Sequence, residues 1–163
     1  MPAELPHTLK LTTVWLLLGT IVFLGFQWWL RNEQRSRFEV HGDVVQLQRG
    51  RDGHYHWPGQ VNGRPVVFLV DTGATASALP AGLAEELALG SEGTVRTNTA
   101  GGTAQGQRVV ADLTLEGGVK IERMRLLALP GLDDQPLLGM DVLGKLRWQH
   151  LDGVLRIDLR PAH

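Results

Sequence analysis

The chain has 163 residues, of which 43% are hydrophobic and 20% are charged, which is enough for one modest globular domain and little more. Its 16 basic and 17 acidic residues give a net charge of -1, and this balance argues against a nucleic-acid-binding protein. The sequence contains no cysteine, so disulfides, thiolate metal sites and cysteine nucleophiles are excluded.

Residues 11–30, LTTVWLLLGTIVFLGFQWWL, carry no charge over the length that a helix needs to cross a bilayer. Lys10 and Arg31 flank the segment, and Trp28 and Trp29 lie at its C-terminal end, where indole rings favour the membrane interface. The alternatives are a cleaved signal peptide, although no small-residue cleavage site follows, and a buried core helix. We therefore predict an uncleaved transmembrane helix that contacts lipid through residues 11–30.

The charges beside this segment leave its orientation open. Arg31, Arg35 and Arg37 outnumber Lys10 across the segment, so the positive-inside rule by itself would place the rest of the chain in the cytoplasm. A long domain can be translocated despite such charges. The predicted organisation is an N-terminal tail at 1–10, the transmembrane helix at 11–30, a juxtamembrane linker at 31–50 and a folded domain at 51–163.

From residue 51 onward, short apolar runs alternate with turn signals, a pattern typical of an all-β domain. Asn62-Gly63 and Asp152-Gly153 are strong signals for two-residue hairpin turns. A short helix is predicted after Pro80, because Ala81 to Leu89 places leucines toward a core. The predicted strands are residues 54–61, 64–70, 93–99, 105–115, 119–129, 148–151 and 154–159.

The run Val66 to Val70 leads directly into Asp71, followed by Thr72 and Gly73. Such a run reads as a strand that is buried on both faces, where a carboxylate is unfavourable unless it is hydrogen-bonded or shared. Asp-x-Gly alone is also ordinary turn chemistry. A second apolar pair followed by glycine, Leu137-Leu138-Gly139, occurs about 65 residues downstream in PLLGMDVL.

Together, FLVDTGATASALP, the glycine-rich turn TAGGTAQG and LLGMDVL resemble, in this order and spacing, the retropepsin-like aspartic proteases, and in particular their bacterial membrane-anchored members. The resemblance covers about residues 53 to 159. It implies an all-β retropepsin-like acid protease fold, a closed β-barrel-like half with a short C-terminal helix. It also implies an aspartic endopeptidase that acts on peptide or protein substrates without a metal or another cofactor.

The resemblance implies a role for each matching residue. Asp71 matches the catalytic aspartate, and Thr72, Gly73 and Ala74 match the rest of the active-site loop, with the Thr72 hydroxyl bonding across the dimer. The loop-supporting motif, which packs behind that loop, matches Leu137, Leu138 and Gly139. Residues 98 to 106 fall where these enzymes carry the flap that closes over substrate, and the flap residues proposed to bind it are Asn98, Thr99, Ala100, Gly101 and Gly102.

An aspartic protease needs two carboxylates that share one proton, and this chain has one Asp-Thr-Gly. We therefore predict a homodimer in which Asp71 faces its symmetry mate. Asp141 is interpreted as a cap on the helix that it begins, and Ser77 as a solvent or loop hydroxyl. His54 and His56 are interpreted as a surface or edge-strand pair without a third metal ligand.

The resemblance also indicates a compartment. It implies a single-pass protein of the bacterial inner membrane with its protease domain in the periplasm, and tethering makes membrane-proximal proteins the expected substrates. The alternative function is a catalytically silent module of the same fold that binds peptides or dimerises at the membrane.

Overall fold

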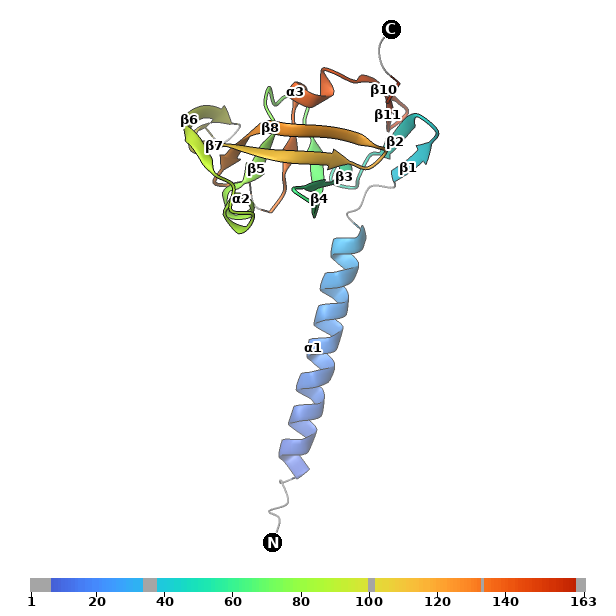
Figure 1. Ribbon diagram of the computed structural model, residues 1–163. Helices are drawn as coiled ribbons and strands as arrows, with labels where there is room; N and C mark the ends of the chain where they lie inside the picture. Colours follow the sequence, from blue (N-terminus) through green and yellow to red (C-terminus); the bar gives the residue numbers. More distant parts are fainter. Residues whose placement is uncertain (1–6, 34–37, 100–101, 133, 161–163) are drawn as a thin grey trace. The chain divides into compact units, whose positions relative to one another are not determined.

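The structure is a computed structural model that describes residues 7–33, 38–99, 102–132 and 134–160 (Figure 1). The chain divides into two compact units, Met1–Arg35 and Ser36–His163. All strands found in the described residues belong to the second unit.

The first unit is formed by the helix α1 (His7–Glu33), which includes all of residues 11–30. Its large apolar side chains between Val14 and Phe26 are more than half exposed. The side chains of Trp28 and Trp29 lie outside the described part. Across the residues that the structure describes, no helix has both the length and the apolarity of a membrane span. The transmembrane prediction for residues 11–30 is therefore not supported by the structure.

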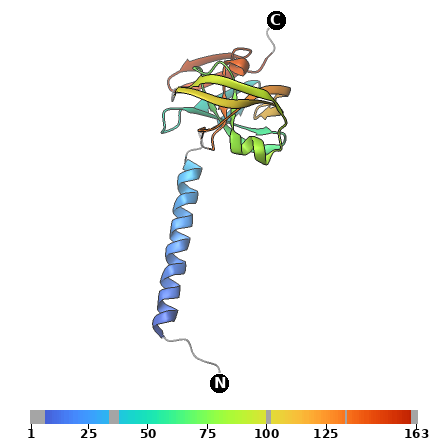
Figure 2. The same ribbon diagram turned by 90° about the vertical axis from the view of Figure 1, so that its left-hand side faces the viewer.

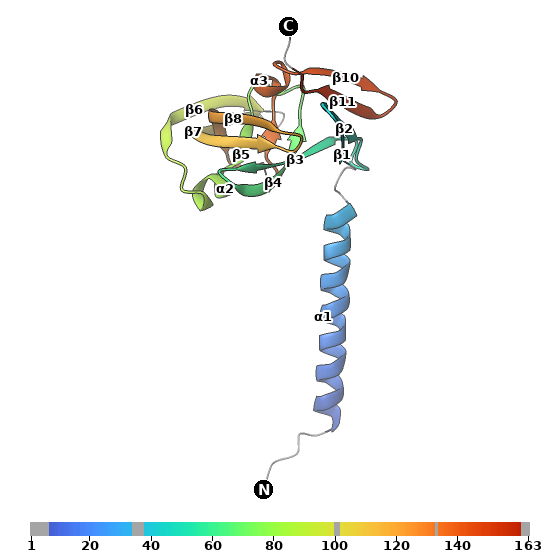
Figure 3. The ribbon, with the colours of Figure 1, turned by 45° about the vertical axis from the view of Figure 1, so that its right-hand side comes forward.

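A four-stranded antiparallel sheet occupies one end of the second unit (Figures 1 and 3). Its order is β1 (Phe38–His41), β2 (Val44–Gln48), β11 (Val154–Asp158) and β10 (Arg147–Leu151). Strands β1 and β2 lie within residues 31–50, which the sequence had indicated as a linker. Val45 and Leu47 are fully buried opposite Ile157 and Leu155 of β11. The linker prediction is wrong for this stretch because its pairing partner lies near the far end of the chain.

The remaining strands form a seven-stranded sheet in the order β3-β4-β9-β5-β8-β7-β6. A further pairing between β3 and β7 closes the sheet on itself, as in a small barrel. This confirms the predicted all-β architecture. The strands are β3 (Tyr55–Val61), β4 (Arg64–Val70), β5 (Ala78–Pro80), β6 (Ser91–Thr99), β7 (Gly102–Leu115), β8 (Val119–Leu129) and β9 (Leu137–Leu138).

Both predicted two-residue turns are present. Asn62 and Gly63 have φ values of 47° and 81°, and Asp152 and Gly153 have φ values of 48° and 76°. Two consecutive positive φ values define the type I′ turn, whose twist matches that of the flanking strands. These turns set the register of β3 against β4 and of β10 against β11.

Two short helices complete the domain, α2 (Ala81–Glu86) and α3 (Met140–Leu143). The long antiparallel strands β7 and β8 cross the domain, as the side view shows (Figure 2). Between the two sheets lies a core that includes residues of β4 and β9, and this core fixes the C-terminal end of β4. Its largest fully buried side chains include Trp57, Phe68, Leu47, Leu79, Leu113, Leu126, Leu138 and Ile157.

Candidate active site

Asp71 follows the last residue of β4 and is half-buried, whereas Thr72 and Gly73 beside it are exposed. On the preceding residues, Leu69 and Val70 pair in parallel with Leu137 and Leu138 of β9. The backbone N–H of Asp71 then donates to the carbonyl oxygen of Leu138 at 3.0 Å. The apolar pair that the sequence placed behind the loop therefore anchors the aspartate through its backbone.

A tight turn fixes the carboxylate itself. The backbone N–H of Gly73 donates to Oδ1 of Asp71 at 2.8 Å, and the N–H of Ala74 donates to the Asp71 carbonyl oxygen at 3.3 Å. A side-chain oxygen that accepts from the N–H two residues later forms an Asx-type turn. The carboxylate is thereby held just beyond the end of β4, with Oδ1 accepting from the loop.

Gly139 packs directly against the active-site loop. A Cβ atom at this position would lie 2.7 Å from the carbonyl carbon of Ala76 and 2.9 Å from the carbonyl oxygen of Ala74. The next residue, Met140, donates its N–H to that same Ala74 oxygen at 2.8 Å. Glycine is required here because the two backbones are in contact, so the structure places Gly139 where the sequence predicted a loop-supporting residue.

The buried Ser77 and the half-buried Asp141 form a hydrogen-bond network that was not predicted from the sequence. The Ser77 N–H and hydroxyl donate to Oδ2 and Oδ1 of Asp141 at 2.9 and 2.7 Å, and the hydroxyl accepts from the N–H of Gly139 at 2.9 Å. Ser77 is fully buried, so its interpretation as a solvent or loop hydroxyl is wrong. The apolar neighbours Ala76, Ala78 and Leu79 were the signal that could have indicated burial.

Asp141 is also not the helix cap that was predicted. The N-cap of α3 is Gly139, and no side chain caps this helix. Both carboxylate oxygens of Asp141 instead accept hydrogen bonds from Ser77. Because both oxygens bond the loop residue Ser77, Asp141 is not available as a second catalytic carboxylate beside Asp71 within the same chain.

The predicted flap residues fall on a long hairpin formed by β6 and β7. Asn98 and Thr99 end β6, and Gly102 begins β7. Thr103 donates its hydroxyl to Oδ1 of Asn98 at 3.2 Å across the strand pair. Ala100 and Gly101 lie outside the described residues. The hairpin is the element that a flap requires, and the substrate contacts of its residues stay a prediction.

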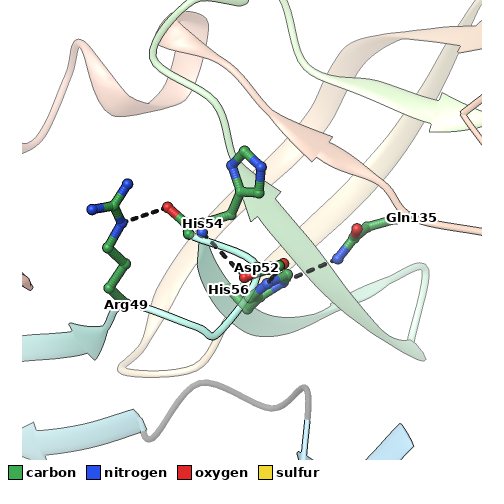
Figure 4. A network of polar contacts seen from close by, with 6 residues as sticks. Arg49, Asp52, His54, His56 and Gln135 are labelled. Carbon is green, nitrogen blue, oxygen red and sulfur yellow. Dashed lines mark hydrogen bonds and ion pairs between the residues drawn. The ribbon is translucent and has the colours of Figure 1, made fainter. Parts of the chain in front are cut away.

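A second polar network surrounds His56, close to the residues that precede Asp71 (Figure 4). Nε2 of His56 lies 2.7 Å from Oδ2 of Asp52, and Nδ1 lies 3.0 Å from Nε2 of Gln135. Figure 4 shows the His54 ring pointing away from these contacts. With 4% of its surface exposed, His56 is not the surface residue that the sequence analysis described.

Asp52 is ionised more readily than an ordinary aspartate. Desolvation opposes its ionisation, but hydrogen bonds from the His54 N–H and the His56 ring, together with the charges of both imidazoles, outweigh it and lower the pKa of Asp52. Within the described ranges, no group of three or more His, Asp or Glu residues is arranged to hold a metal ion.

Comparison with known proteins places this geometry in a family. Among solved structures, a retropepsin-like aspartic protease from Rickettsia conorii has a TM-score of 0.58 at 24% identity, over 77% of this chain and 97% of that one. The retroviral protease-like domain of Ddi1 from Leishmania major has a TM-score of 0.44 at 18% identity, over 65% of this chain and 93% of that one.

The Simian Foamy Virus (mac) protease has a TM-score of 0.42 at 19% identity, over 55% of this chain and 91% of that one. No curated protein matches the sequence of the chain. The family model described as gag-polyprotein putative aspartyl protease matches residues 57–145, a span that contains Asp71, Ser77, Gly139 and Asp141. The chain therefore belongs to this aspartyl protease family and has the retropepsin-like fold.

Proposed function

We propose that the chain is an aspartic endopeptidase that hydrolyses peptide bonds as a homodimer, with one Asp71 from each copy. The observation that carries the proposal is the Asp71 turn, in which Leu138 holds the backbone and Gly73 holds one carboxylate oxygen. The chain belongs to a family of aspartyl proteases. Because each chain has one Asp-Thr-Gly, the second catalytic carboxylate would come from a second copy of the chain.

Strand β10, one of the two edge strands of the four-stranded sheet, is the surface that we assign to the second copy. All residues of β10 are exposed, including Trp148 and Leu151, and an exposed edge strand is a ready template for another chain. The His150 ring of β10 packs edge-on against the Tyr55 ring, with ring centroids 5.8 Å apart. Tyr55 pairs with Val70, which precedes Asp71, so this edge lies near the catalytic loop.

In the proposed mechanism, two carboxylates a few ångströms apart share one proton because like charges oppose double ionisation. The ionised Asp71 accepts a proton from water as the water oxygen bonds to the scissile carbonyl carbon. The protonated Asp71 gives its proton to the carbonyl oxygen. The C–N bond of the resulting diol then breaks as the Asp71 that was protonated by water gives its proton to the leaving amine. A diol hydroxyl returns its proton to the other Asp71 as the product carboxyl group forms, so the pair again holds one proton and no covalent intermediate forms.

The β6–β7 hairpin is the proposed flap. Closure of a hairpin over an extended peptide would exclude bulk water and add backbone hydrogen bonds to the substrate. Asn98, Thr99, Ala100, Gly101 and Gly102 are the proposed substrate-binding residues. The proposal gives Thr72 a hydrogen bond across the dimer, and its exposure in the single chain is compatible with that role.

We further propose that α1 associates with the bacterial inner membrane and leaves the protease domain in the periplasm. The support is the uncharged stretch at residues 11–30 and the exposure of its apolar side chains between Val14 and Phe26. Membrane-proximal proteins would then be the substrates. Alkaline extraction tests the membrane association: the wild-type chain should stay with the membranes, and the double variant Leu17→Lys with Phe23→Lys should be released. Accessibility of the domain to added protease in spheroplasts tests whether the domain lies on the periplasmic side.

Cleavage of a peptide library between pH 4 and 7 tests the proposed activity. The full-length chain is compared with Asp71→Asn and with Asp152→Asn, a matched exposed aspartate in a turn that also accepts asparagine. We expect Asp71→Asn to abolish cleavage while the fold persists and Asp152→Asn to cleave normally. A folded dimer that cleaves nothing would instead favour a catalytically silent module that binds peptides.

A further inference from the structure

Asp52, His56 and Gln135 form a connected set, here called the His56 latch, which lies on the same face of the β3–β4 pair as the approach to Asp71. His56 pairs with Leu69 in the register of β3 and β4. Alternate residues of a strand share a face, so the His56 ring stands beside the strand position two residues before Asp71. None of these three side chains belongs to the active-site loop itself.

His56 contacts one polar side chain at each ring nitrogen. Nδ1 of His56 lies 3.0 Å from Nε2 of Gln135, and an amide nitrogen can donate to an unprotonated ring nitrogen. On the other side of the ring, Nε2 lies 2.7 Å from Oδ2 of Asp52, and an ionised carboxylate accepts hydrogen bonds. The His56 ring is thus held between Gln135 on one side and Asp52 on the other.

Asp52 connects the latch to a fixed part of the domain. It belongs to the loop that joins β2 to β3, and this loop is bonded internally by the Gly50 N–H to the His54 carbonyl oxygen at 2.7 Å. Its first residue, Arg49, donates its N–H to the Gly153 carbonyl oxygen in the β10–β11 turn at 3.0 Å. The Asp52 side of the latch is thus anchored to the four-stranded sheet.

Gln135 connects the latch to the segment behind Asp71. The next residue, Pro136, accepts the N–H of Leu69 at 2.8 Å, and Leu138 accepts the N–H of Asp71 at 3.0 Å. The segment from Gln135 to Leu138 therefore supplies the backbone acceptors for the end of β4. β9 itself is only the residue pair Leu137–Leu138, so its own ladder gives it little stiffness.

We propose that His56 is a positioning residue which, through Gln135, holds the short strand β9 in place and so sets the position of Asp71. This deepens the proposed protease function and rests on it for its catalytic consequence. The latch joins two segments that are 79 residues apart in sequence. Its removal would loosen the acceptors behind Asp71 without touching any residue of the active-site loop.

Amide hydrogen exchange in the full-length chain tests this directly and needs no substrate. Gln135→Met keeps the length of the side chain and removes its donor, and Gln60→Met is the matched control at an exposed position on the His56 strand. We expect the Leu69 and Asp71 amides to exchange about three- to tenfold faster in Gln135→Met, the change that losing one ordinary hydrogen bond produces. Equal exchange in both variants would overturn the proposal.

Two variants of His56 separate positioning from simple packing. Asn at position 56 offers an acceptor near the place of Nδ1, which Gln135 contacts, whereas Gln offers a donor near the place of Nε2, which Asp52 contacts. If the link to Gln135 carries the effect, His56→Asn keeps slow exchange at Asp71 and His56→Gln does not. The opposite order, or the same loss in both folded variants, contradicts the assigned role.

Catalysis provides a second measurement. Gln135→Met should lower kcat of peptide cleavage more than it raises KM, because the proposed effect is on the reacting carboxylate, and Gln60→Met should change neither. A wild-type chain that cleaves no peptide would refute the protease proposal, yet the exchange rates of Leu69 and Asp71 would still decide the latch. The failures of the two proposals are therefore distinguishable.

Discussion

The hydroxyl of Ser77 donates to Oδ1 of Asp141 at 2.7 Å, while the Ser77 N–H donates to Oδ2 of the same carboxylate at 2.9 Å. This pair joins the end of the active-site loop to α3 across 64 residues of sequence. The hydroxyl also accepts from the Gly139 N–H. One buried serine therefore hydrogen-bonds both the backbone between β9 and α3 and the carboxylate of Asp141, and so ties them to the loop that follows Asp71.

Removing this hydroxyl should destabilise the fold. Ser77→Ala removes the hydroxyl that bonds the Gly139 N–H and Oδ1 of Asp141. Because Ser77 is buried, we expect this loss to lower the free energy of unfolding by about 1–3 kcal/mol. Urea denaturation measures the change, with Ser91→Ala as the control at an exposed serine that also accepts one backbone N–H. Equal stability of the two variants would show that the Ser77 network contributes little.

A methyl group at Gly139 should be far more harmful than one at Gly82. The Cβ at Gly139 would lie 2.7 Å from the Ala76 carbonyl carbon, whereas nothing lies within 4 Å of a Cβ at Gly82 in α2. We expect Gly139→Ala to lose about 1–3 kcal/mol through overpacking and Gly82→Ala to gain about 0.5–1 kcal/mol through helix propensity. Thermal unfolding of the two variants checks the difference in sign.

Mixing subunits tests whether two copies of Asp71 form one site. With a threefold excess of Asp71→Asn over wild type and free exchange of subunits, wild-type activity should fall to about a quarter, because one partner in four is then wild type. The same threefold excess of Asp152→Asn over wild type should instead raise the total activity, because this variant keeps Asp71. Activity that is indifferent to the inactive chain would rule out a shared site.

The lowered pKa of Asp52 predicts how acid affects stability. Because the folded state favours the ionised carboxylate, its contribution is present above the ordinary aspartate pKa of about 4 and is lost as the pH falls through the folded pKa. The difference in unfolding free energy between wild type and Asp52→Asn should therefore be largest near pH 7 and shrink below about pH 4. With 42% of the Asp52 side chain exposed, solvent screening keeps this contribution small.

A constant difference between wild type and Asp52→Asn at all pH values would contradict that assignment. Urea titrations at pH 7, 4 and 3 are sufficient to decide, because the other carboxylates are common to both proteins and their effects cancel. The same measurements on Gln135→Met report whether the Asp52 side of the latch depends on its Gln135 side.

The sequence by itself determined the features that depend on neighbouring residues. Positive φ at Asn62-Gly63 and Asp152-Gly153 follows from residue type, so both hairpins were predicted correctly. The apolar run before Asp71 likewise predicted β4 from its own residues. That Leu137-Leu138-Gly139 packs behind Asp71 was not a local inference, because it came from the resemblance to the retropepsin-like proteases. The helical character of residues 11–30 was likewise local, whereas their predicted transmembrane role was not supported.

Only the tertiary structure decided which polar groups are buried and with whom. Ser77 and His56 sit in sequences that are equally compatible with exposure, and their partners Asp141 and Gln135 lie 64 and 79 residues away. The same is true of Val45 and Leu47, which join the core because β11 pairs with them. Hydrogen bonds and burial depend on groups brought together by the whole fold, and local patterns of residues carry no record of such distant partners.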